Sequence, residues 1–168
     1  MELGLILQDD LSLSDYRALA AFRFQIRRFL HFSEVAAKDE GLEPQQHQML
    51  LAILALEQDG GPTVGNLASH LLIQHHSAVG LVDRLATRGL VERMRGGGDR
   101  RQVRIGLTRA GEDKLRRLSA QHRVELRSSG RLLVSALAEL LDGLSTIPAG
   151  PASGLAPKKE DVSETENR

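Results

Sequence analysis

One stretch of the sequence, residues 65–107, constrains the fold more than any other because short periodic segments and tight turns alternate within it. Residues 65–71 and 75–88 each carry a helical pattern, and residues 72–74 form a turn between them. Gly89 stands where a glycine commonly closes a helix. Two short helices joined by a tight turn predict a helix-turn-helix, whose second helix can enter the major groove of DNA.

A β-hairpin is predicted immediately after these helices. Residues 91–95 alternate between apolar and polar, and residues 103–107 alternate again. The loop between them contains three consecutive glycines and then Asp99-Arg100-Arg101. A helix-turn-helix followed by such a hairpin is a winged helix, and its wing can place an arginine in the minor groove of DNA.

Longer helical patterns flank this unit on both sides. Leu19, Phe22, Ile26, Phe29 and Ser33 are spaced three and four residues apart, which predicts a helix over residues 15–38. Pro44 opens a second helix over residues 44–57, whose apolar run at residues 49–56 should be buried. Thr108 caps another helix, which residues 128–130 (Ser-Ser-Gly) should interrupt before a last helix over residues 132–144.

These elements predict a mainly α-helical chain with a small β-hairpin wing, an α+β winged helix-turn-helix. One domain is expected over residues 15–147, with the winged lobe at about residues 45–109. Long helices at about residues 15–40 and 109–147 flank the lobe. Residues 1–14 should form an N-terminal arm, and residues 148–168, which lack periodicity, a disordered tail.

The charge of the chain is neutral overall, with 22 basic and 22 acidic residues, but it is unevenly divided. Residues 1–62 hold five basic and ten acidic residues, whereas residues 63–109 hold eight arginines against three acidic residues. The basic surplus falls on the predicted winged lobe, and the planar fork of arginine suits phosphate and guanine. All five aromatic residues lie in the acidic segment, which favours a core or subunit interface over a base-stacking platform.

Several of these stretches resemble the MarR-type transcription regulators. They are residues 64–68 (Val-Gly-Asn-Leu-Ala), residues 77–93, Asp99-Arg100-Arg101, and residues 107–111 (Leu-Thr-Arg-Ala-Gly). The resemblance covers about residues 14–145. It implies a homodimer held by the first and last helices, with winged lobes that bind a pseudo-palindromic operator. Many members of that family are repressors that small aromatic or amphipathic anions release from DNA.

The resemblance also assigns DNA-contacting residues, which lie at the start of the second short helix and in the wing: His75, His76, Ser77, Gly80, Arg84, Arg100 and Arg101. Asp99 matches the residue that braces the wing, and Arg101 the arginine that enters the minor groove. Arg84 is expected to reach phosphate, and an ion pair with Asp83 is the alternative. Gly80 departs from the family pattern, because many members carry a polar residue there.

A second group of candidates lies near the junction of the first two long helices: Phe24, Arg27, Arg28, His31 and His47. Aromatic walls with an arginine or histidine could bind the carboxylate of an aromatic acid effector. A histidine with a purely structural role stays open as the alternative. His31 and Glu34 could share a zinc ion, but two ligands do not make a site.

Other functional classes lack the residues they need. The chain has no cysteine, no phosphate-binding loop and no Ser–His–acid arrangement, so neither an enzyme nor a cofactor is expected. The longest apolar run has eight residues, against the ~18 that span a bilayer, so a cytoplasmic protein is expected. The predicted function is a sequence-specific regulator that binds double-stranded DNA. A winged-helix module that binds protein, or a zinc-responsive regulator of the same fold, is the alternative.

Overall fold

The computed structural model describes residues 12–57, 61–95 and 103–144. Its elements in chain order are α1 (Leu13–Asp39), α2 (Pro44–Ala55), α3 (Val64–Leu71), α4 (His75–Thr87), β1 (Val91–Arg95), β2 (Val103–Leu107) and α5 (Arg109–Leu144). The predicted fold class, a mainly helical chain with one small hairpin, is confirmed. Residues 1–11 and the predicted tail at residues 148–168 lie outside the described residues.

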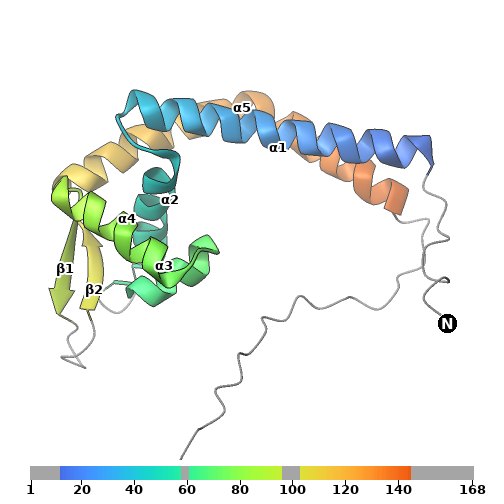
Figure 1. Cartoon of the computed structure of the whole chain (residues 1–168). Helices are drawn as coiled ribbons and strands as arrows, with labels where there is room; N and C mark the ends of the chain where they lie inside the picture. Colours follow the sequence, from blue (N-terminus) through green and yellow to red (C-terminus); the bar gives the residue numbers. More distant parts are fainter. Residues whose placement is uncertain (1–11, 58–60, 96–102, 145–168) are drawn as a thin grey trace, which may run out of the picture.

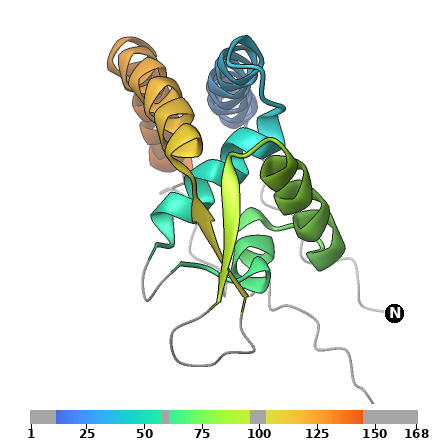
Figure 2. The ribbon, with the colours of Figure 1, turned by 90° about the vertical axis from the view of Figure 1, so that its left-hand side faces the viewer.

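The two long helices α1 and α5 run side by side, and the other elements gather at one end of the pair (Figure 1). Figure 2 shows the hairpin projecting from that end, away from α1 and α5. We call residues 13–35 of α1 together with residues 119–144 of α5 the arm. The rest of the described chain is the lobe.

Local sequence explains where two of the helices begin. The Ser12 hydroxyl accepts a hydrogen bond from the backbone N–H of Asp15 at 3.2 Å, and the Asp15 carboxylate accepts one from the Ser12 N–H at 2.8 Å. Thr63 and Asn66 form the same reciprocal pair at the start of α3. Each box satisfies N–H groups that a helix start leaves unpaired, which fixes the first residue of α1 and of α3.

The lobe is built around one apolar core to which α2, α3, α4, β2 and the start of α5 contribute. Its fully buried side chains include Leu50, Leu67, Leu85, Ile105 and Leu118. The hairpin is antiparallel, with Val91 opposite Leu107 and Arg93 opposite Ile105. The buried Ile105 anchors the hairpin, since its backbone N–H also donates to the Pro62 carbonyl at 2.9 Å.

The predicted break at residues 128–130 is wrong, because α5 is one continuous helix of 36 residues. The hydroxyls of Ser128 and Ser129 donate back to the Glu125 carbonyl at 2.9 and 3.0 Å, so both serines stay within the helix. Serine and glycine lower helix propensity by at most about 1 kcal/mol each, and packing along α1 outweighs that cost.

The apolar run at residues 49–56 is only partly buried. Met49, Leu50 and Ile53 lie in the core, whereas Leu51 and Leu54 are about half exposed, so the prediction of complete burial is wrong. The helix α2 also ends at Ala55 rather than at residue 57. Among the described residues, no helix is both long and apolar enough to cross a membrane.

Candidate nucleic-acid interface

The N-terminal end of α4 is an exposed polar surface backed by a buried apolar one. His75, His76 and Ser77 are exposed, while Ala78, Leu81, Val82 and Leu85 face the core. The residue before the helix, Gln74, makes no side-chain hydrogen bond to its first N–H groups. These N–H groups carry the positive end of the helix dipole, which favours an anion.

Arg84 lies on the exposed side of the same helix, one turn after Gly80. A Cβ at Gly80 would stand 3.4 Å from Nη1 of Arg84, so the glycine lets the guanidinium lie close against the helix. Asp83 pairs with Arg93 of β1 at 2.5 Å. The acidic neighbour that could have neutralised Arg84 is therefore bound to the hairpin.

The wing candidates Asp99, Arg100 and Arg101 lie in residues 96–102, outside the described residues. The two strands that carry this loop are described, and their antiparallel register pairs Arg95 with Val103. The structure thus describes the base of the predicted wing, and the roles of Asp99, Arg100 and Arg101 stay predictions.

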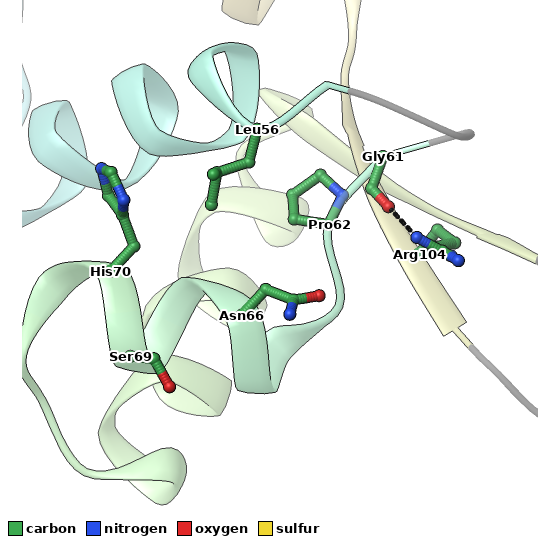
Figure 3. Close-up of a pocket in the computed structure, with 7 residues that line it drawn as sticks. All are labelled: Leu56, Gly61, Pro62, Asn66, Ser69, His70 and Arg104. Carbon is green, nitrogen blue, oxygen red and sulfur yellow. Dashed lines mark hydrogen bonds between the residues drawn. The ribbon is translucent and has the colours of Figure 1, made fainter.

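A pocket that the sequence did not indicate opens beside the hairpin, between α3 and β2 (Figure 3). Asn66, Ser69 and His70 line it from α3 and Arg104 from β2, and the described residues that line it include no carboxylate. The Arg104 guanidinium donates to the Gly61 carbonyl at 2.7 Å, which ties the segment before α3 to the hairpin. Arg104 and Gly61 are 43 positions apart in sequence, so no local sequence pattern could have indicated that they line one pocket.

A cluster of histidines lies between α1, α2 and α5, where the arm joins the lobe. The rings of His47 and His122 are 4.9 Å apart, and Phe29 and Phe32 meet His122 edge to face. Nδ1 of His122 donates to the Leu118 carbonyl at 2.8 Å, and Nε2 of the same ring is hydrogen-bonded to the Ser33 hydroxyl at 2.9 Å.

His47 is the buried member of this cluster, with 5% of its surface exposed, and its Nδ1 has no hydrogen-bond partner among the described residues. Burial, together with a smaller contribution from repulsion by the His122 ring, lowers the pKa of His47 from 6.5 to about 4. A histidine held neutral in this way can offer a hydrogen bond but no charge near neutral pH.

Within the single chain, four of the five predicted effector residues are exposed on α1 and one, His47, is buried on α2. Phe24 is 53% exposed on α1, Arg27 and His31 are also exposed, and Arg28 lies 3.7 Å from Glu125 of α5. Of the five, the structure brings only His47 into the histidine cluster. Sequence reasoning missed His122 and Ser33 because the pairing of α1 with α5 joins residues 89 positions apart. Among the described residues, no group of three or more His, Cys, Asp or Glu side chains could hold a metal ion.

Charged side chains connect the lobe to the end of α1. Arg88, which follows α4, donates to the Gly41 carbonyl at 2.7 Å and to the Gln46 side chain at 2.9 Å. From α5, Arg117 binds both carboxylate oxygens of Glu40, and this hydrogen bonding lowers the pKa of Glu40. The turn at residues 40–41 therefore receives contacts from both the C-terminal end of α4 and α5.

Comparisons with known proteins agree with this architecture. A family model described as the MarR family matches residues 40–102. The structure of CouR from Rhodococcus jostii RHA1, solved with p-coumaroyl-CoA, is similar to the chain with a TM-score of 0.57 and 25% identity, covering 73% of this chain and 87% of CouR.

Two further structures share the fold at lower identity. AbsC, a MarR family transcriptional regulator from Streptomyces coelicolor, has a TM-score of 0.63 at 20% identity, covering 82% of this chain and 93% of AbsC. The S. aureus MepR–DNA complex has a TM-score of 0.55 at 18% identity, covering 73% of this chain and 93% of MepR. No curated protein sequence matches the chain.

Proposed function

We propose that this chain, whose residues 40–102 match the MarR family model, is a MarR-type transcription regulator that acts as a homodimeric repressor of a pseudo-palindromic operator. The observation that carries this proposal is α4. Its exposed start is polar and free of acidic side chains, its opposite face is buried, and the hairpin lies beside it. This is the arrangement by which a recognition helix enters the major groove.

The proposal gives each candidate residue a role. His75, His76 and Ser77 read base edges at the floor of the groove, and Gly80 lets the helix approach closely. Arg84 contacts a backbone phosphate. It is available for this contact because Asp83, its acidic neighbour, pairs with Arg93. Arg100 and Arg101 act from the wing on the adjacent minor groove, with Asp99 bracing the loop.

A dimer is proposed because the arm exposes apolar side chains that a second copy could cover. Tyr16 and Leu30 on α1, and Val134, Leu137 and Leu141 on α5, are exposed in the single chain. Monomeric proteins rarely leave contiguous apolar surface of this kind. One winged lobe buries only a modest area on DNA, so two lobes reading two half-sites give the affinity that one lacks.

We further propose that a small aromatic acid or its thioester binds near the histidine cluster and releases the DNA. The cluster offers two aromatic rings and the unpaired Nδ1 of His47 where the arm meets the lobe. Arg27, Arg28, Phe24 and His31 lie on α1, which contributes Ser33 to the cluster. The CouR complex with p-coumaroyl-CoA supplies the first compound to test.

Selection of duplexes from a random library with the purified full chain tests DNA binding. We expect one pseudo-palindromic sequence to be enriched, and its affinity to fall with salt at about −0.9 per neutralised phosphate on a log–log scale. Arg84→Ala should reduce that slope by about 1. Arg101→Ala should weaken binding of the selected duplex while the oligomeric state stays the same.

The matched control for these variants is Arg123→Ala, which removes an exposed arginine from α5. It should leave both affinity and slope unchanged. Enrichment of no sequence at all would overturn the proposed function. An Arg101→Ala variant as tight as the wild type would overturn the wing assignment alone. Addition of p-coumaroyl-CoA, free p-coumarate and coenzyme A to the selected complex then tests the proposed release.

A further inference from the structure

Three helices of this chain end in the same backbone motif. After α1 the N–H of Leu42 donates to the Ala37 carbonyl, and after α4 the N–H of Leu90 donates to the Leu85 carbonyl. After α3 the N–H of Ile73 donates to the Ala68 carbonyl at 3.0 Å, and the N–H of Leu72 donates to the Ser69 carbonyl at 3.2 Å. This pair of bonds is the Schellman motif, which requires a left-handed residue just past the helix.

The residue in the left-handed position differs at one of the three ends. It is Gly41 after α1, with φ of 69°, and Gly89 after α4, with φ of 67°. After α3 it is Leu72, with φ of 55°, the single non-glycine residue of positive φ in the described chain. Glycine adopts this conformation without a steric penalty, whereas a leucine Cβ crowds the following carbonyl.

Packing within the chain does not explain this leucine. The side chain of Leu72 is 92% exposed, the highest value among the large apolar residues of the described chain. The apolar contact that completes a Schellman motif comes from the next residue, which is buried at Leu42 and Leu90 and packs on the core at Ile73. Leu72 therefore adds strain to the turn and buries almost nothing in return.

The position of the turn indicates what Leu72 could touch. It precedes His75, the first residue of α4, by three residues, a span of at most about 10 Å between Cα atoms. In Figure 1 the turn between α3 and α4 lies at the N-terminal end of α4, below α1. Residues 69–77 contain three histidines and no carboxylate, so the segment that carries Leu72 has no negative side chain to repel a polyanion.

We propose that Leu72 is a specificity-determining residue that packs against the C5-methyl group of a thymine at the edge of the site read by α4. That methyl is the apolar group that a base pair presents in the major groove. The proposal rests on the DNA-binding function above. Strain retained at an exposed position is expected where the side chain serves a ligand and not the fold.

The test compares three variants on the best duplex selected by the wild-type chain. Leu72→Gly and Leu72→Asn both suit the left-handed position and remove the apolar side chain. They should raise the melting temperature by roughly 2–4 °C and weaken binding of the selected duplex roughly fivefold. Leu72→Met keeps an apolar side chain and the same backbone strain, and it should retain both the melting temperature and the affinity of the wild type.

Replacing each thymine of the duplex in turn by deoxyuridine removes only the methyl group. Wild-type binding should weaken severalfold at one thymine in each half-site, and Leu72→Gly should be insensitive to that replacement. Equal affinity of Leu72→Gly and the wild type would overturn the proposal and leave a protein partner as the occupant of this side chain. A changed oligomeric state of Leu72→Gly in size-exclusion chromatography would also overturn it, in favour of a second copy.

Failure of this inference is distinguishable from failure of the proposed function. If the wild-type chain enriches no duplex, the DNA-binding function is wrong and with it the role of Leu72. If the wild-type chain binds its duplex and the uridine scan finds no position that depends on Leu72, only the inference fails.

Discussion

The lobe and the arm bury their apolar residues in different ways. In the lobe, leucines such as Leu50, Leu67 and Leu85 are entirely enclosed by the same chain. Over the described part of the arm, only Ser129 and Ala136 are buried, while valines and leucines of α5 face outward. The lobe therefore encloses its own core, whereas the arm exposes apolar side chains that the proposed second copy would cover.

The largest expected effect comes from adding a side-chain atom inside the lobe, where the start of α5 contacts the backbone of Leu90. A Cβ at Gly111 would stand 2.0 Å from the Leu90 carbonyl oxygen, which is backbone and cannot rotate away. Gly111→Ala should therefore lower the free energy of unfolding by at least about 3 kcal/mol, measured by urea denaturation.

The matched control lies in the arm part of the same helix. A Cβ at Gly130 would meet only the Leu126 side chain, at 3.8 Å. Gly130→Ala should stay within about 1 kcal/mol of the wild type. Equal losses for the two variants would contradict the distinction between a tightly closed lobe and an open arm.

The next effect tests whether the arm binds a second copy. Val134 and Leu137 are 67% and 39% exposed on α5. Replacing both by Glu would bury unpaired charges in a dimer but leave them solvated in a monomer. We expect the dimer to dissociate at least roughly 100-fold more readily, a change of about 2.7 kcal/mol, in sedimentation equilibrium.

Gln121→Glu is the control for that experiment, because it adds a carboxylate at an exposed polar position of the same helix. It should leave dissociation unchanged. A wild-type chain that sediments as a monomer at micromolar concentration would contradict the proposal that a second copy covers the apolar side chains of the arm.

The junction between the two regions should make stability depend on pH. His47 takes up a proton near pH 6.5 in the unfolded chain but only near pH 4 in the folded one. The stabilisation that the folded state gains by keeping His47 neutral is complete above about pH 6.5. It declines by about 1.4 kcal/mol per pH unit as the pH falls towards 4. Between pH 7 and pH 5 the free energy of unfolding should fall by about 2 kcal/mol.

His47→Leu should abolish this dependence, and His31→Leu, which removes an exposed histidine of α1, should preserve it. The lowered pKa of Glu40 acts only below its ordinary value of 4.5, so it does not contribute in this range. A wild-type stability that is flat from pH 7 to pH 5 would show that the cluster is open to solvent.

The smallest expected change in stability concerns Gly80, the one glycine inside α4. Gly80→Ala should raise the free energy of unfolding by about 0.5–1 kcal/mol, because alanine is the better helix former and the space at Gly80 faces only the mobile end of Arg84. Titration of the selected duplex measures whether displacing Arg84 weakens binding. A loss of stability would mean that the glycine is required by the lobe itself.

Periodicity in the sequence predicted the short elements well, because each is defined locally. The turn at residues 72–74, the end of α4 at Gly89 and the two strands all follow from residue types within a few positions. Periodicity failed where packing overrides propensity. Ser128 and Gly130 weaken a helix in isolation, yet contact with α1 carries α5 through them.

The candidate site divides in the same way. The exposure of His75, His76 and Arg84 follows from the apolar stripe on the other side of α4, which the sequence displays. The meeting of His122 with His47, and with Ser33 89 positions away, depends on how α1, α2 and α5 pack, since helices so distant in sequence can pair in many registers. The four candidates on α1, Phe24, Arg27, Arg28 and His31, share one exposed face of that helix, as their spacing predicts, whereas His47 is buried on α2.

The sequence by itself determined the order of helices, turn and hairpin, and the concentration of arginine on the lobe, because these depend on local spacing and composition. The tertiary structure decided which charges stay available and which rings are buried. It engaged Asp83 with Arg93 rather than Arg84, and it enclosed His47 while leaving Leu72 exposed in a strained turn. Burial and pairing are properties of surfaces brought together by folding, and no local pattern contains them.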